Sequence, residues 1–177
     1  IQLTQEWDKI FPQSDKVDHR KVIFKNRYGL TLVGDLYVPK NAKGKLPAIA
    51  VSGPFGAVKE QTSGLYAQTL AERGFVTIAF DGSYTGESSG TPRNVPSPEI
   101  NTEDFSAAVD FLGSLDNVNR DEIGILGVCG WGGFALNAAV SDPRIKAVAV
   151  STMYDMTRVT ANDYEIKMQA NADGSYD

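Results

Sequence analysis

The chain has 177 residues, of which 42% are hydrophobic and 22% charged. This length and composition suit one globular domain and exclude a disordered chain. The net charge of -5 argues against nucleic acid as a general partner, because phosphate binding requires clustered Lys and Arg. No apolar run approaches the roughly 20 residues that cross a bilayer, so we expect no membrane partner.

Cysteine and histidine each occur once, as Cys129 and His19. A single cysteine excludes an internal disulfide and argues against a cysteine-based zinc site, and we expect neither a metal nor a cofactor. A free thiol is compatible with a cytoplasmic location, which we expect, although a signal peptide that has already been removed would leave the same sequence.

The pattern of apolar residues predicts alternating strands and helices. Near the N-terminus, 21–26 and 31–38 are predicted to form an antiparallel hairpin around the turn at 27–29. Short, wholly apolar runs predict strands buried on both faces of a parallel sheet, over 48–51, 75–80, 123–128 and 145–150. Helical spacing predicts helices over 61–73, 102–115 and 132–140.

The first predicted helix is marked by Leu65, Tyr66, Thr69 and Leu70 at helical spacing, and it closes on Gly74. The whole order predicts an α/β fold: a doubly wound, mostly parallel sheet with an N-terminal antiparallel hairpin. Ligands of such sheets bind beyond the carboxyl ends of the strands. Those ends are predicted at 52–56, 81–86, 129–132 and 151–154.

Cys129 lies at a turn between a buried strand and a helix. Gly127 precedes it by two residues, and Gly130, Gly132 and Gly133 follow it. Small residues on both sides of a strand-to-helix turn are typical of a nucleophile elbow. The helix N-terminus would lower the pKa of the thiol, and the N–H of Gly130 would be the first oxyanion donor. The alternative is a cysteine buried as a small hydrophobic residue.

The same segment also fits a dinucleotide-binding fingerprint. Residues 130–135 match G-x-G-x-x-[GA], and Asp155 follows Ala135 by 20 residues. Such a fingerprint normally opens the first βαβ unit, whereas a hairpin and two βα units precede it here. A dinucleotide-binding oxidoreductase therefore stays as an alternative function.

These motifs together resemble the dienelactone-hydrolase-like branch of the α/β-hydrolases, and more closely those with a GxCGWGG-type elbow. The resemblance rests on the segments 52–56, 81–88, 127–133 and 151–155. It implies an eight-stranded sheet of which this chain supplies the first six strands. Residues 1–155 would then be the N-terminal part of the hydrolase domain, and 156–177 the truncated start of a cap-like or lid segment.

The resemblance also assigns candidate site residues. A backbone N–H of the loop after the first buried strand would complete the oxyanion hole, and Phe55 is the expected donor because Pro54 has no N–H. Gly53 stands where dienelactone hydrolase has a glutamate, which puts that specific reaction in doubt. Trp131 and Tyr154 are the candidate substrate-binding residues; Trp131 would either lean into the cleft or pack against the neighbouring helix.

The function implied is hydrolysis of a small-molecule ester, thioester or lactone through Cys129. The chain order of these hydrolases places the histidine after the nucleophile, so His19 is expected to be a surface or hairpin residue. We therefore expect a fragment that is inactive alone and needs a C-terminal companion for its Asp and His. A non-catalytic binding or interaction module is the alternative, and an exposed sheet edge would favour a homo-oligomer.

Other polar residues of the predicted strand ends are assigned structural roles. Asp81 is expected to fix its loop by an Asx-type turn. Glu87 and Asp155 are expected to be solvated or structural. Arg93 is a candidate to bind a substrate carboxylate, and only its position in a loop supports this.

Overall fold

The computed structural model describes residues 3–156, 158 and 159, and its centre is one sheet with the strand order β1-β2-β4-β3-β5-β6. The strands are β1 (Val17–Lys25), β2 (Thr31–Pro39), β3 (Leu46–Ser52), β4 (Val76–Phe80), β5 (Val118–Val128) and β6 (Ile145–Ser151). The helices are α1 (Thr62–Glu72), α2 (Pro98–Gly113) and α3 (Trp131–Ser141).

The sheet is antiparallel at its N-terminal edge and parallel elsewhere. β1 pairs antiparallel with β2, from Val17 opposite Pro39 to Lys25 opposite Thr31. β2 then pairs antiparallel with β4, whereas β3 is parallel to both β4 and β5, and β5 to β6. The predicted hairpin and parallel sheet are both confirmed.

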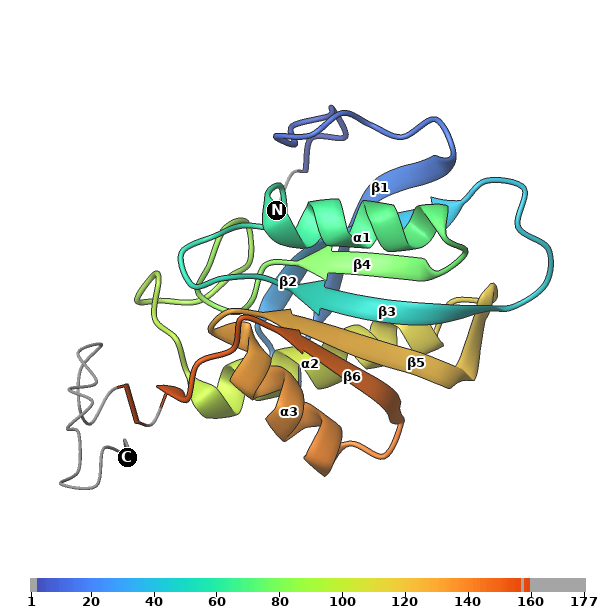
Figure 1. The fold of residues 1–177 in the computed structure, drawn as a ribbon. Helices are drawn as coiled ribbons and strands as arrows, with labels where there is room; N and C mark the ends of the chain where they lie inside the picture. Colours follow the sequence, from blue (N-terminus) through green and yellow to red (C-terminus); the bar gives the residue numbers. More distant parts are fainter. Residues whose placement is uncertain (1–2, 157, 160–177) are drawn as a thin grey trace, which may run out of the picture.

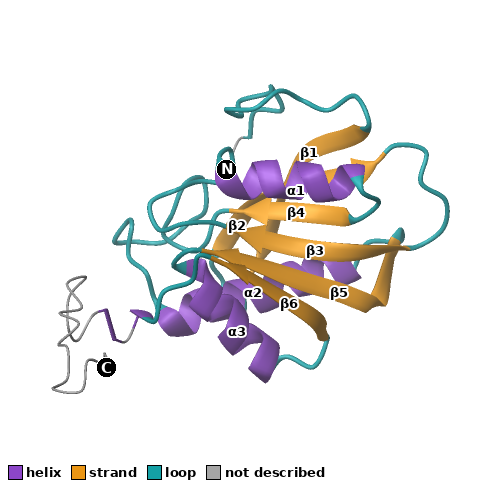
Figure 2. Cartoon of the chain, in the orientation of Figure 1, coloured by secondary structure: helices purple, strands orange, loops and turns teal. Residues whose placement is uncertain are grey.

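Helices cover both faces of this sheet. Figures 1 and 2 show α1 beside β4 on one face of the sheet, and α2 and α3 side by side on the other. The larger hydrophobic cluster lies between the sheet and the α2–α3 pair and includes Phe80, Phe105, Leu112 and Trp131. The doubly wound architecture is therefore the predicted one.

The residues that α1 buries are not the apolar residues that were predicted to mark its buried face. Leu65 and Tyr66 are 49% and 39% exposed, whereas Ala67 and Ala71 are completely buried. Gly64 explains the difference, because an added Cβ would lie 2.2 Å from the carbonyl oxygen of Lys59. Small residues let α1 approach the sheet and the preceding loop closely, and its bulky residues are turned outward as a result.

The strand predicted at 145–150 forms, but it is not buried in the described part of the chain. In β6 only Ile145 is buried, and Val148 and Val150 are 37% and 39% exposed. Among the described strands, β6 pairs with β5 alone. Among the described elements α3 packs on it, while α1 lies over β3 and β4 instead. An apolar run alone cannot distinguish an edge strand from a central one.

Three elements begin four or five residues earlier than predicted, the first being β1, which begins at Val17 instead of residue 21. α2 begins at Pro98, and the Ser97 hydroxyl accepts a hydrogen bond from the N–H of Ile100, which forms an N-cap followed by proline. β5 begins at Val118 rather than at residue 123. The predicted partial helix at 164–170 lies outside the described residues. Within the described residues no helix is long and apolar enough to cross a membrane.

Candidate active site

Four loops meet at the edge where the parallel strands end. In Figure 1 the arrowheads of β3, β4 and β5 point to the same side of the molecule, and the loops after them gather there. Cys129 follows β5, the loop 53–61 follows β3, the loop 81–97 follows β4, and Tyr154 follows β6. This is the edge at which the sequence predicted a ligand site.

Cys129 occupies a left-handed backbone conformation between β5 and α3. Its φ is 55°, a value that costs a residue with a side chain about 1–2 kcal/mol. The Cys129 N–H donates to the carbonyl of Ser151 at 2.8 Å, and its own carbonyl accepts from the N–H of Gly132 at 3.0 Å. The thiol is half-buried. Strained residues of this kind concentrate at functional sites.

Two of the glycines around Cys129 are required by close packing. An added Cβ on Gly127 would lie 2.4 Å from the carbonyl oxygen of Trp131, so a glycine is needed where strand and helix cross. An added Cβ on Gly130 would lie 2.5 Å from two ring carbons of Phe55. The structure thus brings together Gly130 and Phe55, the two residues predicted to supply oxyanion donors. Within the described residues, neither of their N–H groups donates to a protein acceptor.

Trp131 lies in the hydrophobic core. It is 6% exposed, and its ring packs edge-to-face against Phe80, Phe105 and Phe134. The ring also borders a cavity of about 150 Å³ that the loops 53–58 and 94–96 help to enclose. Trp131 was predicted either to lean into the cleft or to pack against the neighbouring helix, and the structure shows it packed. Its contact with substrate stays a prediction.

Tyr154 and the charged candidates have different surroundings. Tyr154 is 47% exposed, and its role in substrate binding stays a prediction. Arg93 donates to the carbonyls of Ser88 and Gly86 at 2.5 and 2.6 Å, so its guanidinium braces its own loop. The Asp155 carboxylate accepts from the N–H of Arg158 at 3.0 Å, which is a structural role.

Of the two placements expected for His19, the structure shows the hairpin and not the surface. It lies on the hairpin, but its side chain is 4% exposed and its Nε2 is 2.7 Å from the Asp35 carboxylate. Three strands separate β1 from β5, which places their backbones about 19 Å apart at the usual strand spacing. His19 therefore cannot act on Cys129.

An ion-paired lysine that the sequence analysis missed joins two of the loops. The Lys59 side chain is completely buried, and its Nζ lies 2.9 Å from Asp81, 2.6 Å from Glu60 and 2.6 Å from Glu87. Burial lowers the pKa of Lys59, but the charges of Asp81, Glu60 and Glu87 outweigh it and raise that pKa above its ordinary value. Lys59 is therefore a permanent cation beneath the candidate site.

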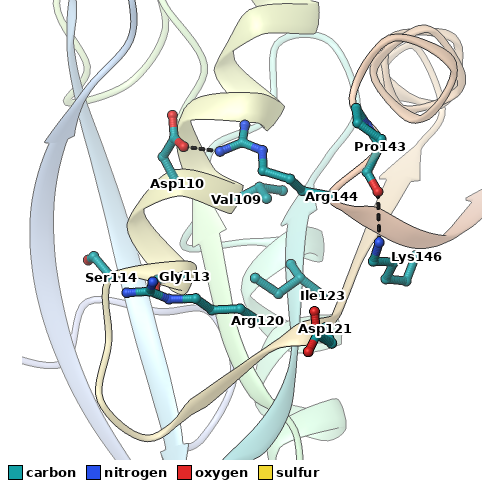
Figure 3. A pocket seen from close by; sticks show the side chains of 10 residues that line it. All are labelled: Val109, Asp110, Gly113, Ser114, Arg120, Asp121, Ile123, Pro143, Arg144 and Lys146. Carbon is teal, nitrogen blue, oxygen red and sulfur yellow. Dashed lines mark hydrogen bonds and ion pairs between the residues drawn. The ribbon is translucent and has the colours of Figure 1, made fainter.

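A second cavity lies away from Cys129. It measures about 580 Å³ and opens at the amino ends of β5 and β6, beside the end of α2 (Figure 3). Its basic side chains already have partners: Arg144 contacts Asp110 and binds both oxygens of Asp142, Lys146 donates to the carbonyl of Pro143, and Arg120 donates to the carbonyl of Gly113.

Comparison with known proteins identifies the family. The X-Pro dipeptidyl-peptidase (S15) family matches residues 29–170, most of the chain. The chain belongs to the S15 family. This family and its structural neighbours are α/β-hydrolases, so the predicted superfamily is confirmed.

Several proteins are similar to this S15-family chain. The protein PA2218 of Pseudomonas aeruginosa is 71% identical over 165 residues, which are 93% of this chain and 44% of PA2218. The thiohydrolase aneE of Aspergillus aculeatus is 33% identical over 135 residues, 76% of this chain and 42% of aneE. The chain thus spans less than half the length of these relatives.

Solved structures agree with this fold. The crystal structure of PA2218 superimposes with a TM-score of 0.91 at 69% identity, covering 95% of this chain and 53% of the other. The α/β-hydrolase GrgF from Penicillium sp. sh18 superimposes with a TM-score of 0.71 at 27% identity, covering 81% and 50%.

The fold also argues against the alternative function of a dinucleotide-binding oxidoreductase. Dinucleotide-binding sheets are built from two βαβαβ halves, whereas this sheet opens with an antiparallel hairpin. The glycines of the fingerprint are covered as well: Phe55 lies against Gly130, and Met153 lies 2.8 Å from an added Cβ on Gly132. These side chains occupy the space beside the two glycines in which a pyrophosphate would have to lie, so the hydrolase interpretation is the better one.

Proposed function

We propose that this chain carries the nucleophile and the oxyanion hole of a hydrolase that acts on esters, thioesters or lactones. The observation that carries the proposal is the left-handed Cys129 at the N-terminus of α3, with Gly130 packed against Phe55. A nucleophile on a strained turn followed by a helix has its side chain presented at the edge of the sheet. Placement in the dienelactone-hydrolase-like branch belongs to the same proposal.

The proposed reaction is acyl transfer in two steps. The Cys129 thiolate attacks the carbonyl carbon, and the N–H groups of Gly130 and Phe55 hold the resulting oxyanion. Collapse of the intermediate breaks the bond to the leaving alkoxide or thiolate, which takes up a proton. Water then attacks the acyl-enzyme thioester, releasing a carboxylic acid and restoring the thiol. The helix dipole of α3 favours both negative species.

A general base must come from outside the described residues. His19 is the only histidine of the chain, and three strands separate it from Cys129. We place the histidine and its acid partner on a further segment or a companion polypeptide, which the longer relatives have room to supply. The chain alone would then be acylated once and release its product slowly.

The substrate class takes its support from the relatives. Esterases and thiohydrolases occur among them, and the name thiohydrolase favours a thioester. An ester of p-nitrophenol is a convenient probe, because p-nitrophenolate is a good leaving group and is coloured.

The test compares the reactivity of the single thiol in the folded chain with its reactivity in the unfolded chain. The folded chain and the same chain unfolded in urea are treated with p-nitrophenyl acetate and with the matching thioester at one pH. We expect faster acylation in the folded chain and a mass increase of one acetyl group. A Cys129→Ala variant should lack this fast acylation. Acylation of the folded chain that is no faster than that of the unfolded chain would contradict the proposal.

A further inference from the structure

Lys59 anchors the loop that carries Phe55 to the loop after β4. It connects β3 to α1 over 53–61, and a hydrogen bond from the N–H of Ala57 to Pro54 forms its turn. The N–H of Lys59 donates to Asp81 Oδ1 at 2.9 Å. The Nζ of the same residue lies 2.9 Å from Asp81 Oδ2. One carboxylate thus holds both the backbone and the side chain of Lys59.

The same carboxylate holds the loop after β4. Asp81 Oδ2 also accepts from the N–H of Glu87 at 3.0 Å, and the Glu87 carboxylate returns to Lys59 at 2.6 Å. Gly86 packs directly on Asp81, since an added Cβ would lie 2.2 Å from Oδ2. The two loops that flank the candidate site are therefore fixed to each other through Lys59 and Asp81.

A contribution to stability does not by itself explain why Lys59 and Asp81 form a buried ion pair. Two apolar residues of similar volume often replace a buried ion pair with no loss of stability, because burial removes the hydration of both charges. What apolar residues cannot reproduce is the direction of the hydrogen bonds. The pair sets the position of the loop backbone four residues after Phe55, and an oxyanion donor acts only at a defined distance from its acceptor.

We propose that Lys59 and Asp81 are positioning residues that place the Phe55 N–H for the oxyanion. The inference rests on the proposed function, since it assigns these residues to that same reaction. Neither side chain touches the substrate; both act through the backbone of the loop 53–61. Their effect therefore belongs to the rate of the acylation step and not to substrate binding.

The experiment measures acylation of Cys129 by p-nitrophenyl acetate over a range of ester concentrations, which separates the limiting rate from the half-saturating concentration. Four variants are compared: Lys59→Met, Lys59→Arg, Asp81→Asn, and the charge-free double variant Lys59→Met with Asp81→Leu. Lys9→Met is the matched control, because Lys9 is equally buried and pairs with Asp8 and Asp35 instead of the loop. The double variant leaves no unpaired charge between these two positions, which favours a folded product.

We expect the limiting rate to fall at least tenfold in Lys59→Met, in Asp81→Asn and in the double variant, with the half-saturating concentration within about threefold of the parent. This is a fraction of the roughly 100- to 1000-fold loss that follows removal of an oxyanion donor. Lys59→Arg should recover part of the rate, and Lys9→Met should stay within twofold. Hydrogen exchange of the backbone amides at 55–58 should be faster in the slow variants.

The outcomes separate the two proposals. If the parent chain reacts no faster than the unfolded chain, the proposed function fails and this inference fails with it. If the parent chain reacts and the folded double variant reacts equally fast, only the inference is overturned. Equal loss in Lys9→Met would also overturn it, because a general loss of stability would then explain the effect.

Discussion

The ring of Phe55 lies so close to Gly130 that an added Cβ would come within 2.5 Å of its carbons Cδ2 and Cε2. Gly130 itself has φ -57° and ψ -29°, a helical conformation that alanine adopts without strain. A methyl group at this position would therefore act by displacing Phe55 and not by distorting its own backbone.

Gly130→Ala is accordingly expected to slow acylation of Cys129 by tenfold or more, because the displaced loop moves the Phe55 donor away from the oxyanion. The measurement is the acylation rate with p-nitrophenyl acetate. Gly133→Ala is the matched control, since no atom lies within 4 Å of an added Cβ there. In the control, helix propensity should raise stability by up to about 1 kcal/mol at an unchanged rate. Equal rates in both variants would contradict the expectation.

The left-handed conformation of Cys129 makes a second prediction. Cys129→Ala and Cys129→Gly both remove the thiol, but only glycine accepts φ 55° without a steric cost. We expect Cys129→Gly to be more stable than Cys129→Ala by about 1 kcal/mol, measured as the midpoint of urea unfolding. The reverse order would mean that the turn stores no strain.

The elbow could be predicted from the sequence, because close packing leaves a local signature. Gly127, Gly130 and Gly132 surround one cysteine within six residues, and each contacts another part of the chain. The bond between Lys59 and Asp81 leaves no such signature. The two residues are 22 positions apart, and they meet because β3 and β4 are neighbours in the sheet. A lysine after a Gly-Pro turn otherwise suggests a solvated side chain.

Two of the differences between predicted and observed burial have a related cause. Leu65 and Tyr66 were expected to mark the apolar side of α1, yet Ala67 and Ala71 are the residues that reach the sheet. Similarly, the run that includes Val148 and Val150 would suit a central strand, but among the described strands β6 pairs with β5 alone. Residue type predicts that an element is apolar; which neighbours cover it depends on the arrangement of the whole fold.

Trp131 provides a third prediction, which tests the substrate role given to it. Three aromatic rings surround its indole at centroid distances of 5.4 to 5.7 Å. We expect Trp131→Ala to lose about 3–5 kcal/mol of unfolding free energy, as core Trp substitutions do. Trp131→Phe should lose less and keep the half-saturating concentration of p-nitrophenyl acetate. A severalfold increase of that concentration in a stable Trp131→Phe variant would instead support direct contact with substrate.

The last prediction concerns acid stability and depends on Asp8, which lies 2.5 Å from Lys9 and 2.6 Å from Lys21. Burial opposes ionisation, but the hydrogen bonds from Lys21 and Lys9 outweigh it and lower the pKa of Asp8 to about 2. In the unfolded chain this pKa is about 3.9. A carboxyl whose pKa is lowered by folding stabilises the protein fully above its unfolded pKa, and this stabilisation is lost as the pH falls toward 2.

The expected size follows from the same shift. Two pKa units correspond to about 2.7 kcal/mol, and solvent screening of the partly exposed carboxylate reduces this to about 1–2 kcal/mol. Asp8→Asn should therefore be less stable than the parent chain by that amount at pH 7, and the difference should shrink between pH 4 and pH 2. Urea unfolding across this range measures it. Asp116→Asn is the control, because Asp116 is exposed and makes no ion pair within the described part of the chain. A difference between Asp8→Asn and the parent that stays constant with pH would show that ionisation of Asp8 is not its source.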